Sequence, residues 1–239
     1  MNDGFLHRYF LNNGHKRLHK WFHYFDAYEH HFSRFRDKKP TVLEIGVFGG
    51  GSLAMWKDYF GEGATIIGLD IDPECKSHEA DGIKVYIGSQ DDPNIIDTIL
   101  SENGTIDIVI DDGSHRMDHV LASFHLLYDR ISPKGVYFVE DTHTCYWPEY
   151  QGGLASPKTF IEFTKAKLDE INAVHTRGAL DVTGFTTSTR SITVYDSICV
   201  YEKYPQATRH SVITEPLVAA TSKPTEANTI SEPANVTEN

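Results

Sequence analysis

The stretch TVLEIGVFGGGS, residues 41–52, constrains the fold more than any other part of the chain. Its apolar residues predict a buried strand, the glycines from Gly46 to Gly51 predict a turn, and Ser52 marks the expected start of a helix. Glycine lets the backbone adopt positive φ and approach a ligand closely. A helix N-terminus offers unpaired N–H groups. The stretch therefore predicts a ligand-binding strand–turn–helix unit of an α/β fold.

The turn departs from the dinucleotide fingerprint G-x-G-x-x-G at its middle position. Gly46 and Gly51 match the first and last glycines, but Phe48 stands where the second glycine lets the backbone approach a pyrophosphate. Glu44 would repel a diphosphate and suits a ligand that carries an ammonium group. S-adenosylmethionine (SAM) has an amino-acid end, a ribose and an adenine, and it has no phosphate. We therefore favour SAM over NAD, with a purely structural turn as the remaining interpretation.

Composition narrows the function classes. The chain has 22 Lys+Arg against 34 Asp+Glu and a net charge of -12, which disfavours nucleic-acid binding through phosphate contacts. Its 3 cysteines are scattered, so they indicate neither a disulfide framework nor a zinc knuckle. No apolar run is long enough to span a membrane, and no signal-peptide core precedes the first strand. We expect a cytoplasmic enzyme that can hold a cation.

Apolar segments alternate with helical patterns along the middle of the chain, which is typical of a Rossmann-like, doubly wound and mostly parallel sheet. The predicted strands are 41–45, 65–70, 83–87, 106–110 and 135–139, and the predicted helices are 52–60, 92–102, 115–131 and 157–174. Residues 183–189 and 191–202 predict an antiparallel hairpin at the edge of this sheet.

The two ends of the chain have different patterns. An aromatic stripe predicts an extra N-terminal helix over 15–36, after a loosely ordered start. From about residue 205 the composition shifts to Thr, Pro, Ala, Glu and Ser, which predicts a disordered tail. The predicted domains are an N-terminal helical segment at 1–40, the ligand-binding domain at 41–203 and the tail at 204–239.

Polar residues at the ends of the second and third strands predict further ligand contacts. Asp70 lies about 20 residues past the glycine turn, where a carboxylate grips a ribose diol. Asp72 is the alternative residue for this ribose contact, although it is also a typical N-cap residue for the helix that follows. Ser89, Gln90 and Asp91 follow the third strand and can read an adenine. The other interpretation is that Asp91 or the next aspartate caps the following helix.

Two buried strands each end in a pair of acids, Asp111-Asp112 and Glu140-Asp141. The carboxyl ends of parallel strands meet at one edge of the sheet, where ligands bind. Four carboxylates at this edge repel one another unless a cation or a proton intervenes. Mg²⁺ or Mn²⁺, which take oxygen ligands, would resolve the repulsion. We predict a divalent-metal site; the alternative is two unrelated loop ends with solvated acids.

A histidine follows each pair of acids. His115 lies three residues after Asp112 at the expected start of a helix, where it can act as a general base near neutral pH. A metal ligand and a polar surface residue are its alternative roles, and His143 is the competing histidine. The aromatic loop 142–156 predicts a lid or a binding surface, because its Tyr and Trp faces suit stacking on a sugar or a polyketide.

These motifs together carry a resemblance to a known family. With LEIGVFGGGSL, GLDIDP, GSQDD, DIVIDDGSH and VEDTHTCYW, the chain resembles the class I SAM-dependent methyltransferases over roughly residues 15–203. More narrowly, it resembles the metal-dependent macrolide sugar O-methyltransferases of the mycinamicin and macrocin type, the rhamnosyl O-methyltransferases and their cephalosporin hydroxylase-like relatives. The resemblance implies methyl transfer to a sugar hydroxyl of a glycosylated natural product or polysaccharide, as in antibiotic biosynthesis. It also implies that a homo-oligomer can form.

Two alternatives stand beside that function: a hydroxylase-like or NAD-using oxidoreductase on the same fold, and a non-catalytic SAM-binding protein. The resemblance implies site residues by position. It implies cofactor contacts at Glu44, Gly46, Asp70 and Gln90, with Asp111 near the cofactor. From the glycine turn, the helix start and the loop after the third strand, Gly50, Ser52 and Asp91 are expected cofactor contacts as well. Metal ligands are expected at Asp112, Glu140 and Asp141, with His115 as the base. The chain departs from the family at Ser89, where Asp is expected, and at Cys145, where Ser is common.

Overall fold

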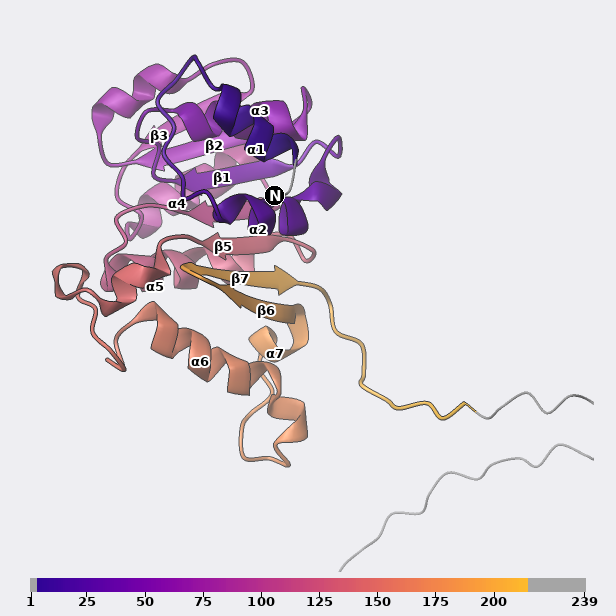
Figure 1. Cartoon of the computed structure of the whole chain (residues 1–239). Helices are drawn as coiled ribbons and strands as arrows, with labels where there is room; N and C mark the ends of the chain where they lie inside the picture. The colour runs from indigo at the N-terminus through magenta and orange to yellow at the C-terminus, as the bar shows by residue number, and fades with distance from the viewer. Residues whose placement is uncertain (1–3, 215–239) are drawn as a thin grey trace, which may run out of the picture. The chain divides into compact units, whose positions relative to one another are not determined.

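A seven-stranded sheet runs through the structure in the order β3-β2-β1-β4-β5-β7-β6 (Figure 1). The computed structural model describes residues 4–214. The strands are β1 Thr41–Ile45, β2 Thr65–Asp70, β3 Ile83–Ile87, β4 Ile108–Asp111, β5 Val136–Val139, β6 Thr189–Tyr195 and β7 Ile198–Lys203. The first five strands are parallel, whereas β7 runs antiparallel to β5 and to β6. The predicted fold class is confirmed.

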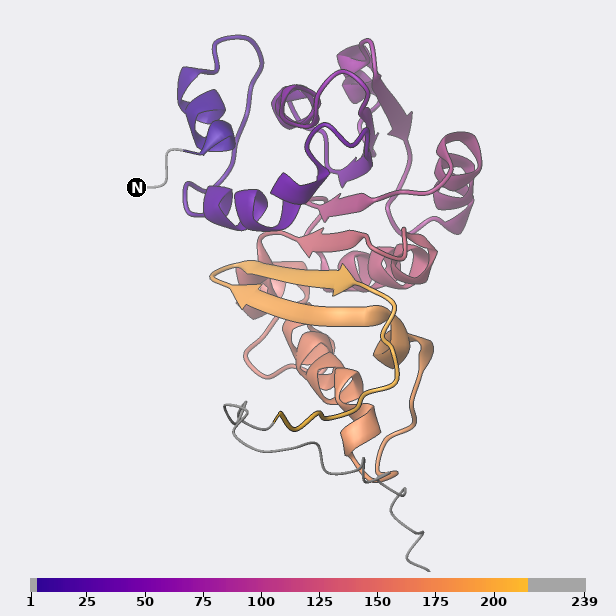
Figure 2. The same ribbon diagram turned by 90° about the vertical axis from the view of Figure 1, so that its right-hand side faces the viewer.

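Helices cover both faces of the sheet. The α-helices are α1 Phe5–Asn12, α2 Tyr24–Phe32, α3 Gly51–Phe60, α4 Pro93–Asn103, α5 Met117–Leu127, α6 Phe160–Ile171 and α7 Gly184–Ser188. Short 3-10 helices are η1 Ser33–Phe35, η2 Pro73–His78, η3 Tyr128–Arg130, η4 Thr142–Tyr146, η5 Pro148–Tyr150 and η6 Ala173–His175. The core on one face comes from α1–α3, and the core on the other comes from α4–α7. Figure 2 shows the indigo N-terminal helices and the pink helices from the middle of the chain on opposite sides of the sheet.

Successive side chains of each strand point to opposite faces of the sheet, so each strand contributes to both cores. Phe138 of β5 packs with the α1–α3 layer, whereas its neighbours Tyr137 and Val139 pack with the α4–α7 layer. The ring of Tyr28 lies 5.1 Å from the rings of both Phe138 and Trp56, which joins α2 to β5 and α3. Burying a large apolar side chain contributes roughly 1.5–3 kcal/mol. This packing fixes α2 against β5 and α3.

The N-terminal part differs from the prediction. Helix α1 occupies residues that were expected to be loosely ordered, and residues 13–23 are not helical, so α2 begins at Tyr24 and not at residue 15. The carbonyl of Arg17 accepts a 3.2 Å hydrogen bond from the amide of Gly51, the first residue of α3. This non-helical stretch therefore packs on the glycine turn. The aromatic periodicity could not reveal that tertiary contact.

The C-terminal hairpin also differs from the prediction. Residues 184–188 form α7, which begins with a capping box between Thr183 and Thr186, and they are not a strand. The hairpin turn lies at Asp196 and Ser197, inside the stretch that was predicted as one strand, and Ser197 adopts φ 64°. Left-handed φ at Ser197 supports the tight turn.

Residues up to Ala207 form one compact unit. This unit contains most of the predicted N-terminal segment and of the predicted ligand-binding domain. The boundary between those two domains stays a prediction. Most of the predicted tail, residues 215–239, lies outside the described residues. Among the described residues, every helix is too short or too polar to cross a membrane.

Candidate functional site

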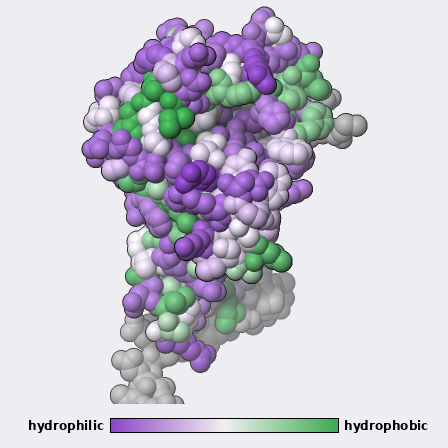
Figure 3. Space-filling view, turned by 90° about the vertical axis from the view of Figure 1, so that its left-hand side faces the viewer, coloured by the Kyte–Doolittle hydropathy of each residue, from purple (hydrophilic) through white to green (hydrophobic). Residues whose placement is uncertain are grey.

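Two adjoining pockets open at the edge of the sheet where the parallel strands end. The first, here the Gln90 pocket, is lined by Ile45, Gly46, Leu69, Asp70, Ile71, Gly88, Ser89, Gln90, Gly113, Ser114 and His119. The second, here the Asp112 pocket, is lined by Arg17, Leu18, His19, Lys20, Gly46, Val47, Phe48, Ser52, Asp70, Asp72, Cys75, Asp112, Gly113, His115 and Asp141. The Asp112 pocket, with a cavity volume of about 390 Å³, falls within the size range of small-molecule sites, and the Gln90 pocket, with about 180 Å³, adjoins it. Figure 3 faces this edge and shows a mostly hydrophilic surface with smaller hydrophobic patches.

Asp70, at the end of β2, holds the glycine turn in place. Its Oδ2 accepts hydrogen bonds from the amides of Val47 at 2.7 Å and Phe48 at 3.2 Å, and its Oδ1 accepts one from Asp72 at 3.0 Å. Burial acts to raise the pKa of Asp70, but these three N–H groups outweigh it and hold that pKa below its usual range. Asp70 lines both pockets, and its contact with a ligand stays a prediction.

Gly46 is the glycine of the turn that both pockets share. It adopts φ 92°, and a Cβ atom there would collide with the backbone carbonyl of Asp112. Only glycine therefore allows the turn to pack this closely on the end of β4. Gly50 also has positive φ, at 68°, but it faces the ring of His78 and lies outside the residues that line the two pockets.

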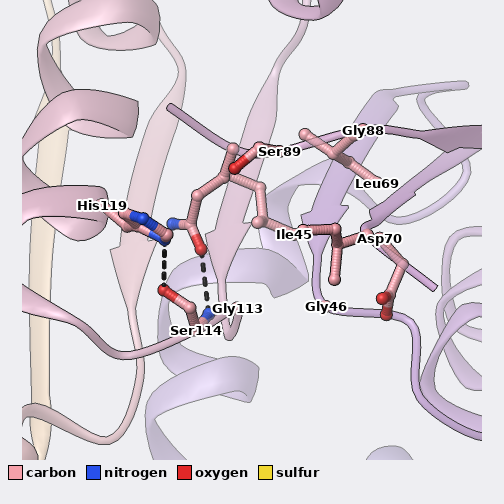
Figure 4. Close-up of a pocket in the computed structure, with 11 residues that line it drawn as sticks. Ile45, Gly46, Leu69, Asp70, Gly88, Ser89, Gly113, Ser114 and His119 are labelled. Atoms are coloured by element: carbon pink, nitrogen blue, oxygen red, sulfur yellow. Dashed lines mark hydrogen bonds between the residues drawn. The ribbon is translucent and has the colours of Figure 1, made fainter. Parts of the chain in front are cut away.

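The floor of the Gln90 pocket is a hydrogen-bond network (Figure 4). Gln90 accepts a 2.9 Å bond from the amide of Ser114 and donates a 3.1 Å bond to Asp111. The Ser114 hydroxyl and His119 Nδ1 are 2.9 Å apart. Asp111 is buried, accepts a hydrogen bond from the Ser123 hydroxyl and does not line either pocket. Asp111 therefore supports the pocket indirectly, through its hydrogen bond with Gln90.

The acids near the third strand have local partners. Asp91 accepts a hydrogen bond from the Ser89 hydroxyl and does not line either pocket. Asp92 is the N-cap of α4, and Asp72 is the N-cap of η2, each accepting a 2.9 Å bond from a backbone amide two residues later. The capping interpretation is confirmed for Asp72 and Asp92.

Lys20 is a residue of the site that the sequence analysis missed. Its side chain is only 2% exposed, and its Nζ lies 3.3 Å from Glu44, 2.7 Å from Asp112 and 3.0 Å from Glu140. Burial acts to lower the pKa of Lys20, but the three carboxylates outweigh it and hold that pKa well above its usual value. Lys20 is one of two lysines in a histidine-rich, aromatic segment, and no local spacing links it to acids far along the chain.

Glu44 is fully buried beneath the Asp112 pocket. Its Oε2 accepts a 2.6 Å hydrogen bond from the hydroxyl of Ser52, and its Oε1 faces Lys20. The sequence predicts that Glu44 suits an ammonium group of a ligand. In the structure the ammonium group beside Glu44 belongs to Lys20 of the chain itself. Ser52 lines the pocket and orients Glu44.

Three predicted residues come together at the mouth of the Asp112 pocket. The Nε2 of His115 lies 3.8 Å from Asp112 Oδ1 and 3.7 Å from Asp141 Oδ2, and one possible ligand atom from each residue falls within 4.8 Å of the others. His115 and Asp141 adopt left-handed φ angles of 56° and 53°. His115 lies directly before the N-cap residue of α5. Strained backbone of this kind concentrates at functional sites. The two carboxylates of this group are the oxygen ligands that Mg²⁺ and Mn²⁺ prefer.

The remaining predicted metal ligand, Glu140, is directed elsewhere. Its side chain is 1% exposed, both of its oxygens lie 3.0 Å from Lys20, and it does not line either pocket. Asp141, the next residue, instead accepts a 2.6 Å hydrogen bond from the hydroxyl of Tyr24. The adjacent acids of this pair therefore have different surroundings.

His143 lies in a third, neighbouring pocket. This aromatic hollow is lined by Trp21, His23, His143, Trp147, Asp196 and Ser197. The ring of His143 lies 4.7 Å from Trp147, and its Nδ1 is 3.1 Å from the Ser197 hydroxyl. Tyr150 links the hollow to the main site, because its ring lies 6.0 Å from Trp147 and 6.3 Å from His115. The predicted loop 142–156 thus supplies aromatic rings next to the carboxylates.

Comparisons of sequence and of structure both find methyltransferases. Residues 43–142 match the family described as "Methyltransferase domain". The 8-demethyl-8-alpha-L-rhamnosyl tetracenomycin-C 2'-O-methyltransferase of Streptomyces olivaceus is 41% identical over 157 residues, which are 62% of this chain and 41% of that protein. The demethylmacrocin O-methyltransferase of Streptomyces fradiae is 44% identical over 144 residues, 56% of this chain and 36% of that protein.

A solved structure is similar over more of the chain. The MycE methyltransferase from the mycinamycin biosynthetic pathway, in complex with Mg and SAH, has a TM-score of 0.73 and 32% identity. The match covers 84% of this chain and 54% of that one. The chain thus spans about half the length of MycE and about two fifths of the length of the two relatives above.

Proposed function

We propose, from the methyltransferase domain that residues 43–142 carry, that this chain transfers a methyl group from SAM to a hydroxyl group of a sugar-bearing acceptor. The observation that supports it most is the continuity of the two pockets. Gly46 and Asp70 line both the Gln90 pocket and the Asp112 pocket, so one elongated ligand can reach from Gln90 to the Asp112–His115–Asp141 group. SAM has that shape, with its adenine at one end and its sulfonium toward the other.

The proposed cofactor contacts follow from the lining residues. The adenine lies in the Gln90 pocket, where Gly88, Ser89 and Gln90 form one wall. The ribose lies at Asp70, at the junction of the pockets. The methionine end extends over Gly46 toward Ser52, which lines the Asp112 pocket, whereas Glu44 behind Ser52 is already paired with the ammonium of Lys20.

The proposed chemistry takes place at the mouth of the Asp112 pocket. His115 accepts the proton of the acceptor hydroxyl, the oxygen forms a bond to the methyl carbon, and the carbon–sulfur bond breaks, so that the sulfonium becomes a thioether. The proton then leaves the imidazole for solvent. When bound at Asp112 and Asp141, a divalent cation supplies positive charge that lowers the pKa of the acceptor hydroxyl.

The acceptor class is supported by the surroundings of His115. Tyr150 and the aromatic hollow lie on one side of it, and their exposed rings suit the apolar faces of a sugar or of the polyketide that carries it. MycE has been solved with mycinamycin VI, and the two relatives above act by name on a rhamnosyl tetracenomycin and on demethylmacrocin. A homo-oligomer stays a prediction.

The first test is calorimetry on the full chain after treatment with EDTA. S-adenosylhomocysteine should bind, and NAD should not. Absence of nucleoside binding, with and without Mg²⁺, would overturn the proposal.

The second test addresses His115. His115→Ala should lower methyl transfer by roughly 10²–10⁴-fold while S-adenosylhomocysteine affinity stays near wild type, because the imidazole takes the proton and does not hold the nucleoside. The matched control is His125→Ala, an exposed histidine on α5. Unchanged turnover in His115→Ala would remove His115 from the mechanism.

A further inference from the structure

Arg17 lies directly on the glycine turn. Its carbonyl accepts a 3.2 Å hydrogen bond from the amide of Gly51. A Cβ atom at Gly49 would lie 2.6 Å from the Cβ of Arg17, and one at Gly51 would lie 2.5 Å from the Arg17 carbonyl oxygen. Both approaches are too close for a side chain. Glycine at these two positions therefore lets the backbone of Arg17 seat on the turn.

The side chain of Arg17 extends over the ring of Phe48. The guanidinium carbon lies 4.4 Å from the centroid of that ring, which is a cation–π contact. Phe48 is 55% exposed and adopts a left-handed φ of 50°, which is unfavourable for a bulky residue. Backbone strain of this kind concentrates at functional sites. Supporting the guanidinium gives this exposed ring a role.

The charges around the Asp112 pocket leave Arg17 available to a ligand. Two lining side chains carry a permanent positive charge, Arg17 and Lys20. Lys20 is buried and pairs with three acids, whereas the exposed Arg17 makes no ion pair within residues 4–214. The acids that line the same pocket are Asp70, Asp72, Asp112 and Asp141.

We propose that the guanidinium of Arg17, supported by the ring of Phe48, binds the carboxylate at the methionine end of SAM. This inference rests on the proposed function for the presence of SAM. It adds a partner for the carboxylate, which the cofactor contacts inferred above do not supply.

The chemistry of SAM explains why this partner is needed. SAM carries a sulfonium, an ammonium and a carboxylate. The aspartates of the pocket suit the two positive groups, but they repel the carboxylate unless a cation faces it. A guanidinium is suited to that task, because its planar fork of N–H groups matches the two oxygens of a carboxylate.

The position of Arg17 agrees with the proposed path of the cofactor. Gly46 and Ser52, over which the methionine end extends, line the same pocket as Arg17 and Phe48. The hydrogen bond to Gly51 fixes Arg17 beside Ser52, and the amide of Phe48 is fixed by Asp70 at 3.2 Å. The guanidinium and the proposed ribose contact are therefore held by the two ends of one turn.

The first experiment compares two nucleosides by calorimetry on the full chain. S-adenosylhomocysteine carries the carboxylate, whereas methylthioadenosine has the same adenosine and sulfur without the amino acid. Arg17→Gln should weaken binding of S-adenosylhomocysteine by roughly 10–100-fold and leave binding of methylthioadenosine near wild type. The matched control is Lys16→Gln, which removes the same charge one residue earlier, outside the lining of the pocket, and should bind both nucleosides like the wild type.

The second experiment tests the ion pair and its support. Salt screens a pair at an exposed guanidinium, so added NaCl should weaken binding of S-adenosylhomocysteine more in the wild type than in Arg17→Gln. Arg17→Lys, which keeps the charge, should retain part of the affinity. Phe48→Leu should weaken binding of S-adenosylhomocysteine in the wild type and have little further effect in Arg17→Gln, because the ring acts through the guanidinium.

The outcomes separate this inference from the proposed function. If the wild type binds S-adenosylhomocysteine and Arg17→Gln binds it equally well, or if both nucleosides lose the same affinity, the inference is wrong and the proposed function stands. If the wild type binds no S-adenosylhomocysteine, both are wrong. An equal effect of Phe48→Leu with and without Arg17 would overturn the role of the ring.

Discussion

The hydroxyl of Tyr24 donates a 2.6 Å hydrogen bond to Oδ1 of Asp141 and so ties the first turn of α2 to the residues that follow β5. Because Tyr24 is fully buried among the aromatic side chains of α2, it is a rigid support. The carboxylate of Asp141 is thereby held within 3.7 Å of His115.

We expect Tyr24→Phe to weaken Mn²⁺ binding and methyl transfer by about tenfold, since a hydrogen bond to a charged group contributes about 1.5–3 kcal/mol. Calorimetry and initial rates measure the two effects. Tyr59→Phe is the matched control, because it removes a 2.8 Å bond to Glu29 away from the site. It should affect stability and leave Mn²⁺ affinity unchanged; equal effects on Mn²⁺ affinity would contradict the role of Tyr24.

Gly46→Ala should destabilise the fold and displace the end of β4, because its Cβ would collide with the Asp112 carbonyl in addition to the strain of positive φ. Gly104→Ala isolates the strain, since Gly104 has φ 73° but open space at its Cβ. The strain alone costs roughly 1–3 kcal/mol. Urea unfolding should therefore give a larger loss for Gly46→Ala, and S-adenosylhomocysteine binding should fall only in that variant. Equal losses would show that the close approach does not matter.

Asp70 should contribute to stability in a pH-dependent way. Its folded pKa is depressed, so its contribution is fully present above the unfolded pKa of about 3.9 and is lost as the pH falls through the lower folded pKa. Asp70→Asn should be less stable than the wild type at pH 7, and the difference should shrink in acid. Urea unfolding between pH 7 and pH 3 measures it, with the exposed Asp58→Asn on α3 as the control. A difference that grows toward acid pH would have the wrong sign.

Trp147→Ala should raise the KM for a glycosylated acceptor by roughly tenfold and leave S-adenosylhomocysteine affinity unchanged, because an aromatic anchor contributes on the order of 1–2 kcal/mol. Tyr146→Ala is a matched control: Tyr146 is 49% exposed against 44% for Trp147, but it is not among the residues that line the aromatic hollow. A similar rise in both variants would argue against a specific role for the hollow.

Much of the site could be predicted because its parts are local in sequence. The glycine turn, Asp70 and the acids after β4 and β5 each follow directly from a strand, and the parallel sheet brings strand ends to one edge. Element types were predicted less well where a tertiary contact opposed the local pattern. Residues 15–23 have a helical stripe but pack on the glycine turn, and residues 184–188 form a capped helix in place of a strand.

The sequence by itself determined the fold class, the glycine turn and the presence of several acids at one edge, because hydrophobic alternation and strand ends act over a few residues. Only the tertiary structure decided which charge each acid meets. Lys20 pairs with Glu44, Asp112 and Glu140 at sequence separations of 24, 92 and 120 residues. Ion pairing depends on distance in space, and no local pattern in the chain carries those distances.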